Sequence, residues 1–163
     1  MKRAARAIFA MVALTVVAAL LVVAPATATA ATTYRLAGIE TGATSSTGMF
    51  AGVLVSQPGT WQATIEHGDL NKAPGGVTSI SGGSFALAPF GASPTGGNIT
   101  GGHLVAGAPT GLAFCTQQFL VGGTLLARNG PGSFQGTLTH YGIRSQGVCN
   151  ASFATFVGSV TLP

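Results

Sequence analysis

The chain has 163 residues, a formal net charge of +4 and a hydrophobic content of 47%, but its N-terminus dominates these values. Three of its basic residues, Lys2, Arg3 and Arg6, lie in the first 30 residues, which hold no acidic residue. The rest carries four basic and three acidic residues, a net charge of +1. This balance argues against a nucleic-acid partner, because neutralising phosphates requires a basic surface that so few cations cannot form.

The N-terminus has the three parts of a secretory signal peptide. A basic stretch at residues 2–6 precedes an apolar run at 7–24, which Thr15 alone interrupts. Small residues follow, and Ala28 and Ala30 form an A-x-A cleavage site.

Two expectations follow for the organisation of the chain. Residues 1–30 are predicted to be a helical signal peptide, cleaved near Ala30, and residues 31–163 a single secreted, extracellular domain. An uncleaved membrane anchor is the alternative, because the apolar run approaches the length of a transmembrane helix. No later stretch is long and apolar enough to span a membrane, so none is expected in the mature chain.

The mature part is rich in glycine, since all 25 glycines follow residue 30, and its short β-branched and aromatic runs alternate with Gly, Pro, Asn and Ser clusters. This pattern predicts an all-β fold of about eight to nine strands, an antiparallel β-barrel, with a β-sandwich as the alternative. The expected strands are Thr33–Glu40, Met49–Gln57, Thr60–His67, Val77–Ser81, Ser84–Ala88, Asn98–Ala106, Phe114–Arg128 (bent or split at Gly122-Gly123), Ser133–Arg144 and Ser152–Leu162.

Three glycine-rich segments carry a resemblance to known proteins: residues 82–87 (GGSFAL), 121–125 (VGGTL) and 132–139 (GSFQGTLT). They resemble a loose group of uncharacterised Gly/Thr-rich secreted proteins of actinobacteria and related bacteria. They are also faintly similar to the last strands of allene oxide cyclase and dirigent barrels. The likeness is compositional and covers about the last third of the chain. It implies a barrel-like fold, and it carries over no catalytic residue.

The chain has two cysteines, Cys115 and Cys149. In an exported protein such a pair normally forms one disulfide, and we predict that bond here. Two separate thiols, or a thiol nucleophile, are the alternatives.

Three histidines are the first candidates for a metal site. Strand alternation puts His67 on the same face as Trp61 and Ile65, His103 on the face of Ile99, and His140 on the face of Phe134 and Leu138. If these strands face one another, the imidazoles meet at a barrel mouth and leave zinc an open fourth position. The alternative is that each histidine forms hydrogen bonds at a strand end, and a one-residue bulge would reverse its face.

The segment from Glu66 to Asn71 holds two of the three acids, Glu66 and Asp69. Its alternating oxygen ligands are compatible with Ca²⁺, but a solvated hairpin end explains them equally well. We therefore predict neither a metal ion nor another cofactor.

Catalytic signatures are weak. The chain lacks a G-x-S-x-G elbow, and a triad would have to combine Asp69 with a histidine from elsewhere in the chain. A glycosidase would need two of Glu40, Glu66 and Asp69 to face each other across a cleft. We assign no catalytic residue and expect the protein not to be an enzyme.

Aromatic residues offer a different kind of site. Trp61, Tyr34 and Tyr141 could form a sugar-stacking surface together with exposed Thr, Ser and Asn, although ordinary core packing is favoured for Trp61. The sequons Asn98-Ile99-Thr100 and Asn150-Ala151-Ser152 are expected to stay unmodified, because the leader has a bacterial composition.

These observations favour a secreted, non-catalytic β-barrel that acts as an extracellular binding or surface-associated module. Its expected partner is a small molecule or a cell-surface component. Three alternatives remain open: a lipocalin-like carrier of a small apolar ligand, an enzyme with its site at the barrel mouth, and a structural envelope protein. The sequence leaves the oligomeric state undetermined.

Overall fold

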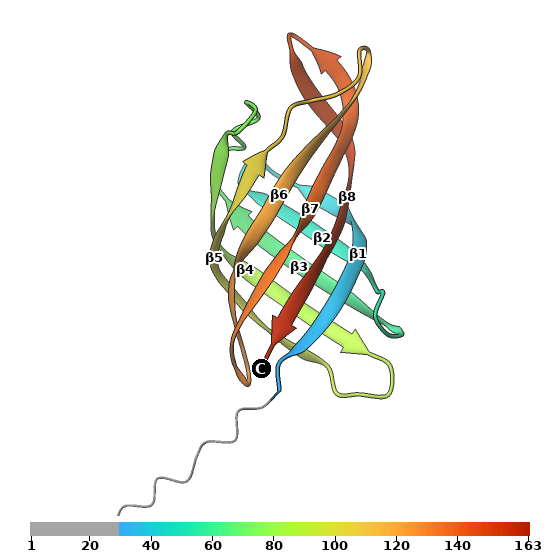
Figure 1. Cartoon of the computed structure of the whole chain (residues 1–163), viewed down its shortest axis with the longest axis vertical. Coiled ribbons are helices and arrows are strands. Elements are labelled where there is room, and N and C mark those ends of the chain that lie inside the picture. Colours follow the sequence, from blue (N-terminus) through green and yellow to red (C-terminus); the bar gives the residue numbers. More distant parts are fainter. Residues whose placement is uncertain (1–29) are drawn as a thin grey trace, which may run out of the picture.

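The computed structural model describes residues 30–163, which form a closed antiparallel barrel of eight strands in sequential order (Figure 1). The predicted signal peptide lies outside the described residues, apart from Ala30. Within the described residues, no helix is long and apolar enough to cross a membrane. The strands are β1 (Thr32–Ala43), β2 (Thr47–Leu54), β3 (Gly59–His67), β4 (Val77–Pro89), β5 (Thr95–Ala106), β6 (Phe114–Ala127), β7 (Gly130–Ser145) and β8 (Val148–Leu162).

The all-β barrel prediction is confirmed, with one correction to the number of separate strands. Residues 77–81 and 84–88, which we expected to be two strands, are parts of β4, and the chain continues through Gly82-Gly83. Gly83 has a φ of 134°, and a Cβ there would collide with the carbonyl of Thr64 on β3. Gly83 therefore allows a close approach of β3 and β4, and the strand does not break there. β6 is likewise unbroken at Gly122-Gly123.

Alternate side chains point into the barrel and fill it. The Trp61 indole lies edge-on to Phe156, with ring centroids 5.6 Å apart, and donates its Nε1–H to the carbonyl of Ala37 at 3.1 Å. Gly38 lies directly beneath this indole. The buried apolar cluster comprises Leu36, Phe50, Leu54, Trp61, Ile65, Ile80, Phe85, Leu87, Ile99, Leu104, Ala106, Phe119, Val121, Leu125, Ala127, Phe134, Leu138, Ala154, Phe156, Val160 and Leu162.

Three strands continue beyond the rim of the barrel at its upper end (Figure 1). The pairing of β8 with β1 ends at Ile39↔Thr155, whereas its pairing with β7 continues to Ser145↔Val148. On the other side of β7, its pairing with β6 continues to Phe114↔Ile143. The upper parts of β6, β7 and β8 therefore form a three-stranded projection, which we call the extension.

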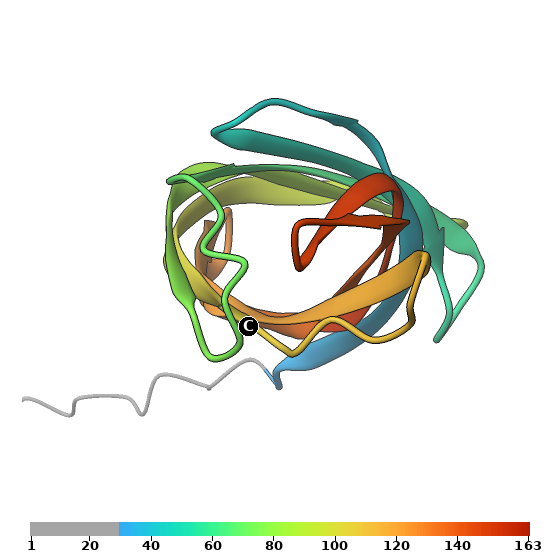
Figure 2. The same ribbon diagram turned by 90° about the horizontal axis from the view of Figure 1, so that it is seen from above.

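A loop of residues 68–76, between β3 and β4, lies over part of the upper mouth (Figure 2). Its Leu70 packs against the core. The Gln117 side chain, buried inside β6, donates a 2.7 Å hydrogen bond to the carbonyl of Lys72, and the backbone of Gly75 donates one of 2.6 Å to Ala106. We call residues 68–76 the lid, because these bonds hold the segment over the apolar interior.

Candidate functional site

The three histidines do not converge, because His103 lies on the outside of the barrel. It is exposed and pairs with Ser79 and Gly122. The prediction that the His103 side chain points inward is wrong, because β5 has a register shift between Ile99 and Gly101. This shift reverses the inward and outward alternation of the side chains that follow it. Within residues 30–163, no group of three His, Cys, Asp or Glu side chains is arranged to hold a metal ion.

His140 does point inward, as the alternation along β7 predicted. Its ring packs against Phe119 with centroids 4.9 Å apart, and only 5% of the residue is exposed. Neither ring nitrogen has a hydrogen-bond partner among the described residues. Burial lowers the pKa of His140 to about 4, assisted by the nearby positive charges of Lys72 and His67. The imidazole is therefore neutral at physiological pH.

Glu40 also points into the upper mouth, on the same face of β1 as Leu36 and Gly38. It pairs with Phe50 of β2, and its carboxylate lies beside Gly48. Burial raises the pKa of Glu40, and the nearby His67 opposes that rise. Sequence reasoning considered Glu40 only as a glycosidase candidate, although its alternation with Leu36 already indicated an inward position.

The three carboxylates considered for a glycosidase lie in different environments. Glu66 and Asp69 are exposed, whereas Glu40 is half-buried inside the mouth. The segment from Glu66 to Asn71, whose oxygen ligands are compatible with Ca²⁺, comprises the end of β3 and the start of the lid. There the Oδ1 of Asn71 accepts a hydrogen bond from the backbone of Ala73 at 3.2 Å, a local turn interaction.

The barrel interior contains one small apolar cavity. Its volume is about 30 Å³, and the rings of Phe50, Trp61, Phe85, Phe134 and Phe156 are among the side chains that line it. Pockets for small-molecule ligands usually measure roughly 300–1,000 Å³. This interior cavity is therefore much smaller than a typical ligand pocket.

A larger hollow lies on the outside of the extension. It has a volume of about 480 Å³ and lies between loop 107–113 and the outer faces of β6 and β7, while other hollows of about 300–430 Å³ lie elsewhere on the barrel surface. We call it the outer groove. Its lining residues are Thr110, Gly111, Phe114, Cys115, Thr116, Tyr141, Gly142, Ile143 and Ser152.

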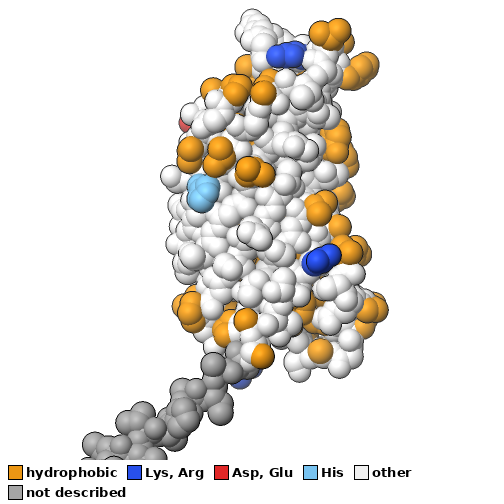
Figure 3. All heavy atoms as spheres, in the orientation of Figure 1, with side chains coloured by type: hydrophobic (Ala, Val, Ile, Leu, Met, Phe, Trp, Pro, Cys, Tyr) orange, Lys and Arg blue, Asp and Glu red, His pale blue; other side chains and the backbone are white. Residues whose placement is uncertain are grey.

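Large apolar side chains are exposed around this groove. Phe114 is 82% exposed, Ile143 62% and Tyr141 39%. Nearby, Leu112 and Phe153 are also exposed. Hydrophobic side chains gather beside a cationic one at the upper end of the molecule in Figure 3. Other apolar side chains are exposed elsewhere on the barrel, such as Val55 and Phe90, but those around the groove lie together and include three aromatic rings, and contiguous apolar patches mark interaction sites.

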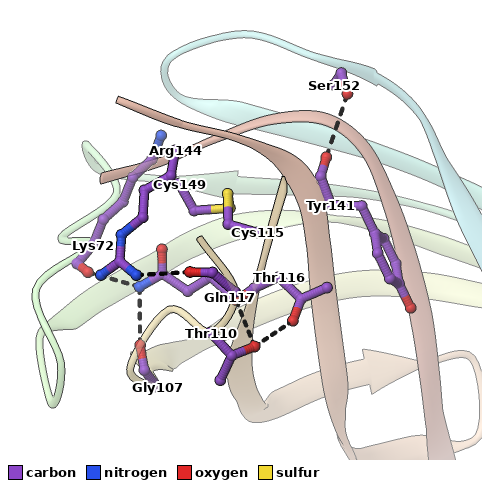
Figure 4. Close-up of a disulfide and its surroundings, with 11 residues drawn as sticks. Lys72, Gly107, Thr110, Cys115, Thr116, Gln117, Tyr141, Arg144, Cys149 and Ser152 are labelled. Carbon is purple, nitrogen blue, oxygen red and sulfur yellow. Dashed lines mark hydrogen bonds between the residues drawn. A yellow bond between two sulfur atoms is a disulfide. The ribbon is translucent and has the colours of Figure 1, made fainter. Parts of the chain in front are cut away.

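The disulfide gives the extension its curved shape. The predicted bond forms between Cys115 of β6 and Cys149 of β8, whose Cα atoms are 5.8 Å apart (Figure 4). In a flat sheet, strands on either side of a third are roughly 10 Å apart. The extension is therefore strongly curled about β7. β8 bulges at Ser152, between the pairs Tyr141↔Phe153 and Gly142↔Ala151, and at Gly142 any Cβ would collide with the carbonyl of Asn150.

The curl determines which side chains face outward. Both cysteines are buried on the concave side, whereas Phe114, Tyr141 and Ile143 occupy the convex side. The guanidinium of Arg144 donates a 2.9 Å hydrogen bond to the carbonyl of Gly111, and this bond connects loop 107–113 to the end of β7. The groove is thus held by a covalent bond and by a hydrogen bond.

The three aromatic residues considered for sugar stacking lie in different environments. Trp61 is in the core, at 5% exposure, and Tyr34 is half-buried against it. Tyr141 alone among them lies on the outside, where its ring is 5.6 Å from that of Phe153. The asparagines of both sequons are exposed.

Comparison of the chain with protein families, with curated proteins and with solved structures finds no match.

Proposed function

We propose that this chain is an exported, non-catalytic binding module that associates with an extracellular surface through the outer groove. The basic, apolar and small-residue segments in the first 30 residues of the sequence support export. The groove, which is lined by exposed aromatic side chains and lies beside the Cys115–Cys149 disulfide, is the observation that carries the proposal.

The contrast between the interior and the exterior supports this function over that of a carrier. The interior cavity of about 30 Å³ is too small for a typical apolar ligand. The groove of about 480 Å³ is open to solvent, and Phe114 and Tyr141 within it are already exposed. A partner can therefore bury their rings without opening the barrel, and exposed aromatic residues of this kind often dominate binding energies.

The polar groups at the upper mouth give less support to an enzyme. Glu40, His67 and His140 lie near one another, but the lid covers part of this mouth and His140 is almost inaccessible to solvent. A general acid or base must reach its substrate within hydrogen-bonding distance. The groove needs no such rearrangement.

The test is co-sedimentation of the secreted protein with isolated envelopes of the source cells. The full chain is expressed in a secreting host and purified from the medium with its disulfide intact. We expect the wild type to sediment, and Phe114→Ala/Tyr141→Ala to bind at least about tenfold more weakly.

The matched control is Leu120→Ala/Val157→Ala, which removes two exposed apolar side chains from the outer face lower on β6 and β8. It should bind like the wild type. Failure of the wild type to sediment, or equal binding by both double variants, contradicts the proposed function.

A further inference from the structure

The chemistry of the outer groove indicates a class of ligand. None of its lining residues carries a charge, and Arg144 at its end is already bonded to Gly111. A cationic ligand would find no carboxylate among the lining residues, and the guanidinium of Arg144, which keeps its charge while it bonds to a carbonyl, lies at the end of the groove and not in its lining. Charge complementarity therefore favours a neutral ligand.

The lining alternates apolar surfaces with hydroxyl groups. The rings of Phe114 and Tyr141 contribute the apolar surfaces, and Thr116 and Ser152 contribute hydroxyls. The Thr116 hydroxyl shares a 2.7 Å hydrogen bond with that of Thr110. A hydroxyl has one donor and two acceptor sites, so this pair keeps capacity for further bonds. In Figure 4 no hydrogen bond joins the phenol of Tyr141 to the other residues drawn, and a phenol can both donate and accept.

Sugar rings match this alternation. A pyranose has C–H faces that pack on aromatic rings, and its edge carries hydroxyls that both donate and accept hydrogen bonds. A purely apolar ligand would bury the phenol and the threonine hydroxyls without partners, which carries a free-energy penalty. Tyrosine suits such a ligand because its ring is apolar and its tip polar.

The surface continues beyond the groove along the extension. Tyr141 pairs with Thr116 on one side and Phe153 on the other, and the Tyr141 and Phe153 rings are inclined by 33°. The next outward row, one step toward the barrel, is Gln118, Thr139 and Thr155. A second ring surface next to polar side chains gives room for more than one sugar unit.

We propose that the outer groove and the adjoining Phe153 bind a neutral oligosaccharide, with Tyr141 and Phe114 stacking on sugar rings. This inference rests on the proposed function, because it names the ligand class of the same site. The aromatic residues need little reorganisation on binding, since the disulfide and the Arg144–Gly111 bond hold the strands that carry them.

The first test uses a panel of neutral oligosaccharides that differ in sugar and linkage: cellohexaose, xylohexaose, mannohexaose, maltohexaose and chitohexaose, together with an array of bacterial glycans. Binding to isotopically labelled protein is followed by amide chemical shifts. We expect at least one compound to shift the amides of Thr116, Tyr141 and Phe153. Tyr141→Ala should weaken that binding about tenfold or more, while Leu120→Ala leaves it unchanged. Absence of shifts at these amides throughout the panel and array overturns the proposal.

The second test separates the ligand class from the proposed function. Envelopes are treated with periodate, which cleaves vicinal diols of sugars, or are extracted with organic solvent, which removes lipids. We expect periodate to abolish co-sedimentation and extraction to leave it intact. Binding that survives periodate but still depends on Tyr141 overturns the carbohydrate proposal and preserves the binding module.

A second copy of the chain is the alternative partner for this exposed aromatic surface. Sedimentation velocity on the same samples tests it. We expect a monomer whose sedimentation is unchanged by Phe114→Ala/Tyr141→Ala. A dimer that this double variant dissociates would overturn the carbohydrate proposal in favour of self-association.

Discussion

The imidazole of His140 packs against the ring of Phe119, with centroids 4.9 Å apart, and neither of its nitrogens has a hydrogen-bond partner among the described residues. Such a side chain is accommodated only in its neutral form, because no group nearby compensates a buried positive charge. Its neighbours include the cation Lys72 on the lid and His67, both of which oppose protonation, while the half-buried Glu40 lies beside His67. The stability of the barrel is thereby coupled to pH.

We expect the free energy of unfolding to fall as the solution is acidified from about pH 6.5 to about pH 4. The pKa of His140 is about 4 in the folded chain and 6.5 without burial. In this window the unfolded chain binds a proton that the folded chain does not, so stability rises with pH. The contribution of His140 is about 3 kcal/mol, measurable by urea unfolding at several pH values.

The variant His140→Leu isolates this effect. It removes no hydrogen bond, so its stability at about pH 7 should lie within about 1 kcal/mol of the wild type, and its pH dependence should be shallower. His103→Gln, on the outer wall, should keep the wild-type profile. Equal slopes for His140→Leu and the wild type would contradict the assignment.

Glu40 should act in the opposite sense. Because burial raises its pKa in the folded chain, its ionised form destabilises the fold above the pKa of the unfolded chain. We expect Glu40→Gln to raise the free energy of unfolding at about pH 7, with a gain that shrinks as the pH falls toward 4.5, the unperturbed value. Glu66→Gln, which changes an exposed carboxylate, should give no comparable gain. A destabilising Glu40→Gln at about pH 7 would show that the carboxylate makes a favourable interaction.

Gly38 should tolerate no side chain. A Cβ there would lie 2.7 Å from Cζ2 of Trp61 and 2.5 Å from the carbonyl oxygen of Ala51. We expect Gly38→Ala to cost about 1–3 kcal/mol of stability through overpacking, measured by urea unfolding. Gly68→Ala is the control, because nothing lies within 4 Å of its added Cβ. A Gly38→Ala variant as stable as Gly68→Ala would mean that the indole does not rest on Gly38.

Removal of the disulfide should affect both stability and binding. Cys115 and Cys149 are separated by 34 residues, and closing such a loop stabilises the folded state by about 4 kcal/mol in the chain-entropy model. We expect Cys115→Ala/Cys149→Ala to lower Tm by roughly 10–15 °C. Below that Tm the barrel should keep its β-sheet circular dichroism while envelope binding weakens, because the curl of the extension is released. Unchanged binding by this variant would show that the disulfide does not hold the groove.

The barrel, the disulfide and the inward position of His140 could be predicted from local sequence, because alternation along a regular strand repeats every two residues. His103 could not be placed in this way. The register shift between Ile99 and Gly101 adds a residue to β5 only. The amino-acid pattern of a glycine-rich segment does not reveal whether it contains such a bulge.

The outer groove could not be predicted from the sequence, for a different reason. The sequence identifies Tyr141 as an aromatic candidate, but its neighbours Phe114 and Phe153 lie on the other strands of the extension, far from it along the chain or beyond a turn. The groove also depends on the curl that the disulfide and Gly142 allow. That shape follows from contacts between distant segments, which periodicity within one strand does not encode.

The most direct test of the central claim compares two affinities for cell envelopes, that of the wild-type protein and that of Phe114→Ala/Tyr141→Ala. With Leu120→Ala/Val157→Ala as the control, we predict a loss of about tenfold or more that is confined to the groove variant. Equal affinity for all three proteins would contradict the assignment of the outer groove as the binding surface.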